Sequence, residues 1–196
     1  MQRGEEDWTG LDEAVTGTIE RLGRFMREQS DAWAIPPAAG RFLHGLVLAT
    51  GAGRLLELGT SYGYSGLWLG WAAKKNHGRL ITIEAEQHKS AIAAEHFKQA
   101  GLDGVILPRV AKIADVLAEI AGPFDFVFID ADKSGTWQYV DLLIDKLTPR
   151  ATIVTDNVIS HEEASAGSLE YLRSHRQLWS TTLPIGSGLE LTIKVE

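Results

Sequence analysis

The chain has 196 residues, of which 44% are hydrophobic and 23% charged, a balance typical of a single soluble globular domain. A net charge of −7 and a pI near 5.4 argue against general electrostatic binding to nucleic acid or to an anionic membrane. The absence of cysteine excludes disulfides, thiolate metal sites and cysteine nucleophiles. With no apolar stretch long enough to span a membrane and no signal-peptide pattern, we expect a cytoplasmic protein.

Two helices are predicted before the first strand. The first has a stripe of apolar side chains at helical spacing, formed by Leu11, Val15, Ile19, Leu22 and Met26. The second runs from about Ala38 to Ala49 and follows two prolines. Because the stripe needs an apolar partner, we interpret it as the surface of a homodimer; packing on its own domain is the alternative.

Strands and helices then alternate. The predicted strands are Arg54–Leu58, Arg79–Ile83, Gly104–Leu107, Phe124–Ile129 and Ala151–Thr155. The predicted helices are Tyr64–Ala73, Gln87–Ala100, Lys112–Ile120, Thr136–Leu147 and, approximately, Ala164–Ser174. This alternation and the near-continuous apolar strands predict a parallel sheet that is covered by helices on both faces.

The C-terminal part of the chain breaks the alternation. Leu178–Leu183 and Leu189–Val195 are separated by a glycine-containing turn that leaves no room for a helix, so an antiparallel hairpin is predicted. The expected fold is a doubly wound α/β domain over residues 1–196 with a mostly parallel, seven-stranded sheet. Residues 1–50 would supply the N-terminal helices and residues 51–196 the core.

The first predicted strand ends in a turn that contains two glycines. Glu57, Gly59 and Gly63 give the spacing E-x-G-x-x-x-G, which is wider than the dinucleotide-binding fingerprint. It resembles motif I of the class I S-adenosylmethionine-dependent methyltransferases, whereas an ordinary strand-to-helix turn is the alternative for this motif alone. The resemblance implies that Gly59 lets the backbone approach the cofactor and that Gly63 permits a tight entry to the helix. It also implies that Ser65 bonds the cofactor carboxylate, in a site that includes Glu57 and Ser61.

Two further positions extend this cofactor site. Glu84 ends the second predicted strand, where a carboxylate in nucleoside-binding sheets accepts hydrogen bonds from both ribose hydroxyls. An acid at a strand end is common, so Glu84 gains meaning only from its interval after the glycine turn. After the third strand, the resemblance places Ile113 against the adenine, although Ala111 stands where relatives usually have glycine.

The fourth and fifth predicted strands both end in hard oxygen ligands. Asp130 follows the fourth strand, and Asp156 and Asn157 follow the fifth. If these strands are neighbours, the three side chains share the edge of the sheet at which open α/β folds bind ligands. Two carboxylates and an amide oxygen suit Mg²⁺. Lys133 is close enough in sequence to act there as a general base, with a surface lysine as the alternative.

These segments resemble the cation-dependent O-methyltransferases, the group of catechol and caffeoyl-CoA O-methyltransferases and their bacterial relatives. The resemblance runs from about Gly53 to Lys194, and its most specific parts read FIDADK and DNV. The chain departs from the family's PIGDGL hairpin at Ser187, which replaces the acid.

By this resemblance, Asp130, Asp156 and Asn157 would hold a divalent cation such as Mg²⁺. Asp130 would also line the cofactor site, and Lys133 would be the base. The expected reaction is the S-adenosylmethionine-dependent methylation of a hydroxyl group on a small catechol-like or phenolic acceptor.

Other acceptors and classes stay open. The acidic balance argues against a polyanionic acceptor, but a local patch of Lys112, Lys133, Arg173 and Arg176 could receive one. A hydroxyuridine in tRNA is therefore the second candidate acceptor, and a non-catalytic cofactor-binding protein is the third interpretation. His161 lies soon after the predicted metal ligands, where it could touch the acceptor or play a simple polar role.

Overall fold

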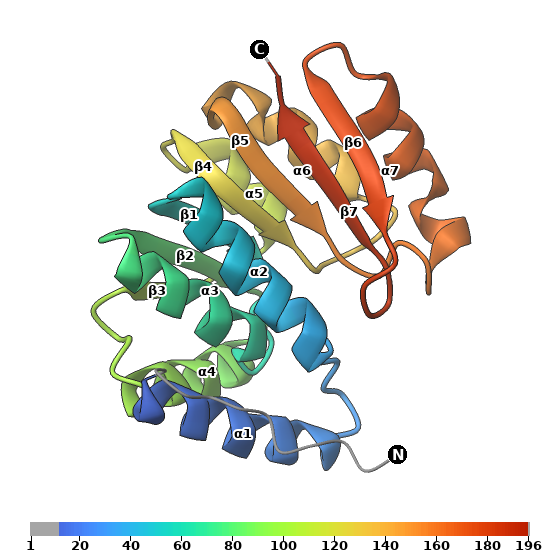
Figure 1. Ribbon diagram of the computed structural model, residues 1–196. Coiled ribbons are helices and arrows are strands. Elements are labelled where there is room, and N and C mark those ends of the chain that lie inside the picture. Colours follow the sequence, from blue (N-terminus) through green and yellow to red (C-terminus); the bar gives the residue numbers. More distant parts are fainter. Residues whose placement is uncertain (1–11, 196) are drawn as a thin grey trace.

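A single sheet forms the centre of the computed structural model, which describes residues 12–195 (Figure 1). Its strand order is β3-β2-β1-β4-β5-β7-β6. The strands are β1 (Arg54–Leu58), β2 (Arg79–Glu84), β3 (Ile106–Val110), β4 (Phe124–Ile129), β5 (Leu147–Thr155), β6 (Leu178–Leu183) and β7 (Leu189–Lys194). Strands β1 to β5 pair in parallel, and β7 runs antiparallel to both β5 and β6. The predicted doubly wound fold with a C-terminal hairpin is thereby confirmed.

Helices cover both faces of this sheet. They are α1 (Glu13–Arg27), α2 (Pro37–Thr50), α3 (Tyr64–Lys75), α4 (Gln87–Gln99), α5 (Ile113–Glu119), α6 (Thr136–Leu143), the 3-10 helix η1 (Ile144–Lys146) and α7 (Glu162–Ser174). One apolar core lies between the sheet and α2, α3 and α4, and a second lies between the sheet and α5, α6 and α7. No helix among the described residues combines the length and apolar character needed to cross a bilayer.

The near-continuous apolar pattern of strand β4 follows from its burial on both faces of the sheet. Phe126 and Phe128 enter the first core, whereas Val127 and Ile129 enter the second. Successive side chains of a strand point to opposite faces, so a strand that is buried on both faces needs apolar residues at every position. All four side chains are fully buried.

The apolar stripe of α1 is buried within its own chain. Val15, Ile19, Leu22 and Met26 belong to the first core, and α1 packs against α3 and α4. Leu11 lies outside the described residues. The helix begins where the Asp12 side chain accepts a hydrogen bond from the backbone N–H of Ala14, an N-cap. The alternative stated for the stripe, packing on its own domain, therefore accounts for its four described residues, which offer no dimer surface.

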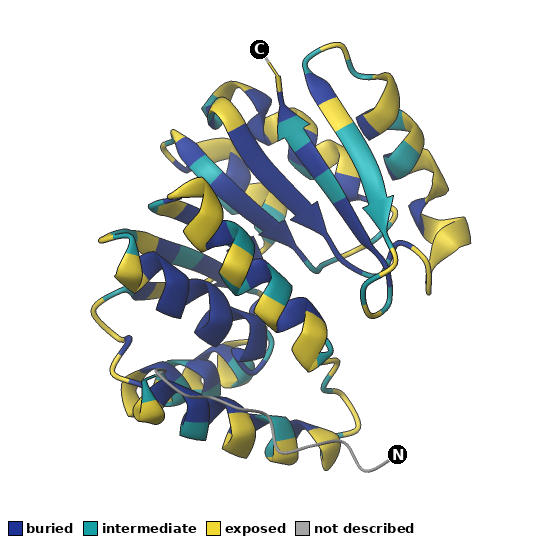
Figure 2. Cartoon of the chain, viewed as in Figure 1, coloured by how far each residue is buried: buried dark blue, intermediate teal, exposed yellow. Residues whose placement is uncertain are grey.

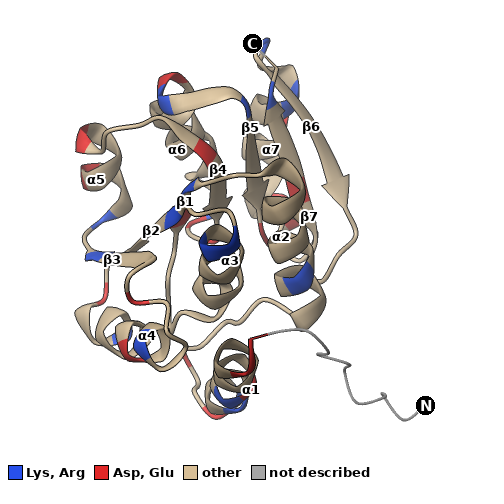
Figure 3. Cartoon of the chain, turned by 60° about the vertical axis from the view of Figure 1, so that its left-hand side comes forward, with Lys and Arg blue, Asp and Glu red and all other residues tan. Residues whose placement is uncertain are grey.

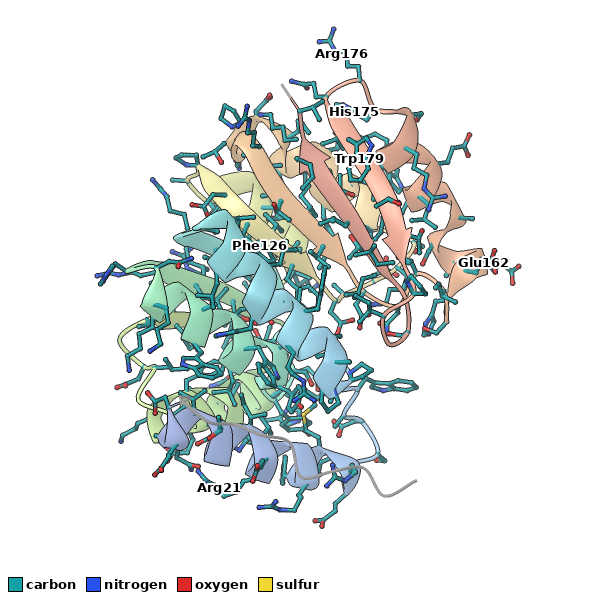
Figure 4. All side chains as sticks on the ribbon, in the orientation of Figure 1. Arg21, Phe126, Glu162, His175, Arg176 and Trp179 are labelled. Atoms are coloured by element: carbon teal, nitrogen blue, oxygen red, sulfur yellow. The ribbon has the colours of Figure 1, made fainter. Side chains whose placement is uncertain are left out.

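Apolar side chains are less covered at the β6 edge of the sheet. Strand β6 contains an exposed stretch on the face that carries α2 (Figure 2). Trp179 of β6 is 53% exposed (Figure 4). Its β7 neighbour Ile193 is only partly buried.

The predicted bounds of three elements, Gly104–Leu107, Thr136–Leu147 and Ala151–Thr155, were wrong for local reasons. Strand β3 begins at Ile106, because Val105 and Ile106 both donate backbone hydrogen bonds to Leu102 in the turn after α4. The predicted helix Thr136–Leu147 is shorter: α6 ends at Leu143 and β5 begins at Leu147. The early part of β5 is irregular, with Arg150 at a φ of 64° and a register shift against β4.

Candidate functional site

A pocket of about 300 Å³ opens at the carboxyl edge of the parallel strands. Its lining contains six of the predicted site residues: Gly59, Ser61, Glu84, Asp130, Lys133 and Asn157. The other lining residues are Asp31, Trp33, Lys89, Ala131 and His161. The ends of β1, β2, β4 and β5 thus contribute to one cavity, as expected for ligand sites of open α/β sheets.

The glycine turn after β1 is shaped by close backbone contacts. Gly59 has a φ of 101°, and a Cβ atom there would collide with the carbonyl oxygen of Asp130. Gly63 has a φ of 93°, and a Cβ atom there would lie 2.8 Å from Cε1 of Phe97. Only glycine combines this conformation with this lack of space, so the two glycines keep the turn tight beneath the pocket.

Glu84 is held by backbone donors. The N–H of Ser61 donates to Oε2 of Glu84 at 2.8 Å, and the N–H of Glu86 donates to Oε1 at 2.9 Å. These bonds fix the plane of the carboxylate at the pocket wall. Each carboxylate oxygen can accept more than one hydrogen bond, so Glu84 retains capacity for a pair of hydroxyls.

Glu57 lies below the pocket and does not line it. Its side chain is fully buried, and Thr82 donates a hydrogen bond to Oε2 at 2.5 Å. Burial raises the pKa of Glu57 to about 7, although hydrogen bonds from Ser65 and Thr82 oppose this shift. Ser65 is likewise buried outside the lining.

Two more predicted cofactor residues lie outside the pocket lining. Gly63 packs against Phe97, and Ile113 is the half-buried first residue of α5, against the second core. Direct cofactor contacts from Glu57, Gly63, Ser65 and Ile113 stay predictions.

The predicted metal ligands meet at the ends of two paired strands. Ile129 of β4 pairs with Thr155 of β5, so Asp130 and Asp156, the next residues, sit side by side. The N–H of Asp156 donates to the carbonyl of Ile129 at 3.0 Å. Burial raises the pKa of Asp156, and the charge of Asp130 raises it further. Asn157 follows with a φ of 66°, a conformation that asparagine tolerates better than most residues.

This donor set fits a divalent cation. The described residues hold no group of three or more His, Cys, Asp or Glu side chains that could bind a metal ion. The predicted set contains two such residues, Asp130 and Asp156, and takes its third oxygen from the amide of Asn157. The Asn157 NH₂ group donates to Ser187 Oγ at 2.9 Å, so its carbonyl oxygen is free for a cation. A cation would also offset the mutual repulsion of the two carboxylates.

Lys133 faces these acids. Its Nζ lies 2.7 Å from Oδ1 of Asp130, and its side chain is only 14% exposed. Its backbone carbonyl accepts a hydrogen bond of 3.1 Å from Oγ of the buried Ser168 in α7. The alternative of a surface lysine therefore does not describe Lys133.

One wall of the pocket was missed from the sequence. The segment between α1 and α2 contributes Asp31 and Trp33, and Trp33 is 79% exposed. Asp31 accepts a hydrogen bond from the Tyr62 hydroxyl at 3.1 Å and lies 3.3 Å from Nζ of Lys89. These bonds fasten the segment to the glycine turn and to α4. No local pattern in the sequence reveals such a long-range contact.

The four basic residues that were suggested to receive a polyanion do not form one patch. Lys133 is paired with Asp130, and Arg173 binds Glu190 on the sheet face beneath α7, with Nε–Oε1 at 3.0 Å. Arg176 lies beyond the C-terminal end of α7, at the opposite end of that helix from Glu162 (Figure 4). The Lys and Arg positions are spread over several elements instead (Figure 3).

The strand order, the glycine turn and the acidic strand ends together define a Rossmann-like methyltransferase architecture. A family model described as O-methyltransferase matches residues 14–192. The chain therefore belongs to this O-methyltransferase family, which confirms the resemblance.

Particular relatives agree with this assignment. The chain is 40% identical over 132 residues to a catechol O-methyltransferase of Niastella koreensis, covering 65% of this chain and 59% of that protein. It is 38% identical over 155 residues to a catechol O-methyltransferase of Mycobacterium tuberculosis, covering 76% and 70%. The crystal structure of the O-methyltransferase TomG from Streptomyces achromogenes in complex with SAM superimposes with a TM-score of 0.81 at 27% identity, covering 94% of this chain and 91% of TomG.

Proposed function

We propose that this protein is an S-adenosylmethionine-dependent O-methyltransferase that uses a divalent cation to methylate a hydroxyl of a small catechol-like acceptor. The observation that carries the proposal is the convergence of two sets of residues in one pocket. Gly59 and Glu84 form the cofactor side, and Asp130, Asn157 and Lys133 form the catalytic side. The names of the two catechol O-methyltransferases and the cofactor bound to TomG support it.

On the cofactor side, the backbone of Gly59, which lines the pocket, would contact the amino-acid part of the cofactor. The fixed carboxylate of Glu84 would accept hydrogen bonds from the ribose hydroxyls. Glu57 and Ser65 would support the glycine turn from beneath the pocket. Ile113 would pack on the adenine of the cofactor.

On the catalytic side, Asp130, Asp156 and Asn157 would hold Mg²⁺ or a similar cation. When bound, such a cation supplies Lewis acidity that lowers the pKa of an acceptor hydroxyl. Lys133 lines the same pocket, and its Nζ in the neutral amine form would take the proton of that hydroxyl. The pocket walls would hold the acceptor oxygen near the methyl group of the cofactor.

The walls near Lys133 favour a small aromatic acceptor. Trp33 offers a broad exposed ring, and His161 lies on the same lining. With the suggested basic patch dispersed, the structure gives no support to tRNA as the acceptor.

Two broader predictions stay proposals. A cytoplasmic location is one of them, and it is tested by none of the structural observations. The homodimer is the other. The apolar face of α1 is buried within the chain, so it no longer supports that prediction. Light scattering at micromolar concentration would test the oligomeric state.

The proposed reaction can be tested with cofactor labelled at its methyl group. The purified protein is offered a catechol, the matching monophenol and hydroxyuridine-containing tRNA, each with Mg²⁺ and with excess chelator. We expect label in the catechol only, and only with Mg²⁺. Full turnover in chelator would refute the metal requirement, and label in tRNA alone would refute the small acceptor. Cofactor binding without any turnover would indicate a non-catalytic protein.

A further inference from the structure

The hairpin turn between β6 and β7 reaches the candidate metal ligands through one side chain. Ser187 Oγ donates a hydrogen bond to Oδ1 of Asp156 at 2.9 Å and accepts one from Nδ2 of Asn157 at 2.9 Å. The hydroxyl therefore bridges two of the three residues proposed to hold the cation. The bridge comes from a segment thirty residues away in sequence.

The direction of these bonds fixes the side chains of both ligands. A serine hydroxyl has a single proton, which here goes to the Asp156 carboxylate, so its lone pairs must accept from the amide NH₂ of Asn157. If the amide were flipped, its oxygen would face a hydroxyl whose proton is already used. The network thus turns the Asn157 carbonyl oxygen away from Ser187.

Backbone contacts hold Ser187 in place. Its carbonyl accepts hydrogen bonds from the N–H groups of Ile159 at 3.1 Å and Ser160 at 2.9 Å. Next to it, Gly188 has a φ of 94°, and a Cβ atom there would collide with the Ile159 side chain. These contacts do not involve the Ser187 hydroxyl, so its loss would leave the turn docked on the loop.

Serine at position 187 can donate a hydrogen bond to Asp156. The acid of the family's PIGDGL hairpin cannot do so when it is ionised. An ionised aspartate only accepts hydrogen bonds, so it could not donate to Asp156. It would also add a third negative charge beside two carboxylates that already repel one another.

We propose that the Ser187 hydroxyl is a positioning group that orients Asp156 and Asn157 for cation binding. The hairpin turn thereby sets the metal affinity of this protein, together with the strand ends. The inference rests on the metal-dependent function proposed above. Residues that orient metal ligands typically change metal affinity by 10- to 100-fold when they are removed.

The test measures Mn²⁺ binding by calorimetry in the full chain, with S-adenosylhomocysteine affinity and the melting temperature as parallel readouts. Ser187→Ala should weaken Mn²⁺ binding by roughly 10- to 100-fold and leave S-adenosylhomocysteine binding unchanged. Ser187→Thr keeps the hydroxyl and should bind Mn²⁺ like the wild type, whereas Ser187→Val, nearly equal to threonine in shape, should behave like Ser187→Ala. If Ser187→Ala does not fold, the threonine and valine pair decides by the same criterion.

Ser134→Ala is the matched control. Its hydroxyl bonds the Asp132 carboxylate at the same edge of the sheet, outside the proposed metal set, so Mn²⁺ affinity should not change. Equal Mn²⁺ affinity in the wild type and Ser187→Ala would overturn the inference and leave the metal-dependent function standing. Equal losses in the threonine and valine variants would also overturn it, since the hydroxyl would then not matter. A wild-type protein that binds S-adenosylhomocysteine but no Mn²⁺ would overturn both proposals.

Discussion

Lys133 combines low exposure with a single acidic partner. Its ammonium group is 2.7 Å from Asp130, and only 14% of its side chain is exposed. A lysine in this position is oriented before any acceptor arrives, and the acceptor needs only to replace or share its carboxylate partner. Its place beside the pocket is what makes it the best candidate for the base.

Replacing Lys133 by alanine should lower kcat by about 10²- to 10⁴-fold, because a positioned general base contributes rate gains of that order. The affinity for S-adenosylhomocysteine should stay within a few fold. Steady-state kinetics with a catechol acceptor and calorimetry would measure the two effects. Lys98→Ala, on the exposed side of α4, serves as the control and should have no effect. Unchanged turnover in Lys133→Ala would assign the proton transfer to solvent or to another group.

Ser168 supports Lys133 from the neighbouring helix. Its hydroxyl donates to the carbonyl of Lys133 at 3.1 Å and accepts from the N–H of Trp137 at 3.3 Å. Ser168→Ala should lower kcat by about 10-fold or more with little change in the KM of the cofactor, because misplacing a catalytic group costs rate. Ser168→Thr should restore much of the rate if its hydroxyl is what matters. A loss in Ser168→Ala that appears only in thermal stability would show a purely structural role.

At the scale of elements, α7 is fixed to the sheet by a buried acid. Glu190 of β7 is fully buried and accepts hydrogen bonds from Arg173 of α7 through both carboxylate oxygens. Ser180 and Thr182 of β6 donate to the same carboxylate. The Glu190 carboxylate thus joins α7 to β6 and β7. Helix α7 also carries Ser168, whose hydroxyl bonds the carbonyl of Lys133.

Arg173→Leu should destabilise the fold by roughly 1–3 kcal/mol, because it leaves the buried Glu190 with incomplete hydrogen bonding. Chemical denaturation would measure the change in the free energy of unfolding. Arg176→Leu, just beyond the same helix, should change it by less than about 0.5 kcal/mol. If both variants behave alike, the ion pair adds nothing to the anchoring of α7.

The sequence pattern predicts the bounds of a strand that is buried on both faces, such as β4. It misplaces the bounds of the edge strand β3 and the start of β5. Strand β4 needs apolar residues at every position, so its pattern marks its ends clearly. Strand β3 lies at the sheet edge, with most of its side chains exposed, and carries little such pattern. The irregular start of β5 contains Pro149 and a left-handed Arg150, whose conformation is imposed by pairing with β4 and has no local signal.

At the scale of the whole molecule, some residues of the candidate site could be placed from the sequence and others could not. Asp130, Asp156 and Glu84 could be placed in advance, because the topology of a parallel sheet brings strand ends to one edge. Asp31 and Trp33 could not, since they reach the pocket only through the docking of α1 and its following segment. The apolar face of α1 was assigned to a dimer because its partners in α3 and α4 are distant in sequence.

The buried Glu57 should make stability of the whole fold depend on pH. Its pKa rises from an ordinary value of 4.5 to about 7, chiefly through burial, so the folded state holds a proton that the unfolded chain has lost. Its contribution to the free energy of unfolding should fall as pH rises from about 4.5 to about 7, by up to roughly 3 kcal/mol.

Glu57→Gln removes this titration. As pH rises from 4.5 to 7, the wild type should therefore lose stability relative to Glu57→Gln. Above that range, the difference between their free energies of unfolding should stay constant. Urea denaturation at several pH values would measure it. A difference that is constant across this window would show that Glu57 titrates equally in the folded and unfolded chain.

The position of β7 has a consequence for the order of events on the ribosome. β7 is synthesised after β6, yet it lies between β5 and β6 in the sheet, and β6 pairs with no other strand. During translation β6 must therefore wait as an unpaired segment until β7 has emerged. Ser187 arrives with the same late hairpin, so the nascent protein would pair β1 to β5 first and form the hydrogen bonds of Ser187 to Asp156 and Asn157 last.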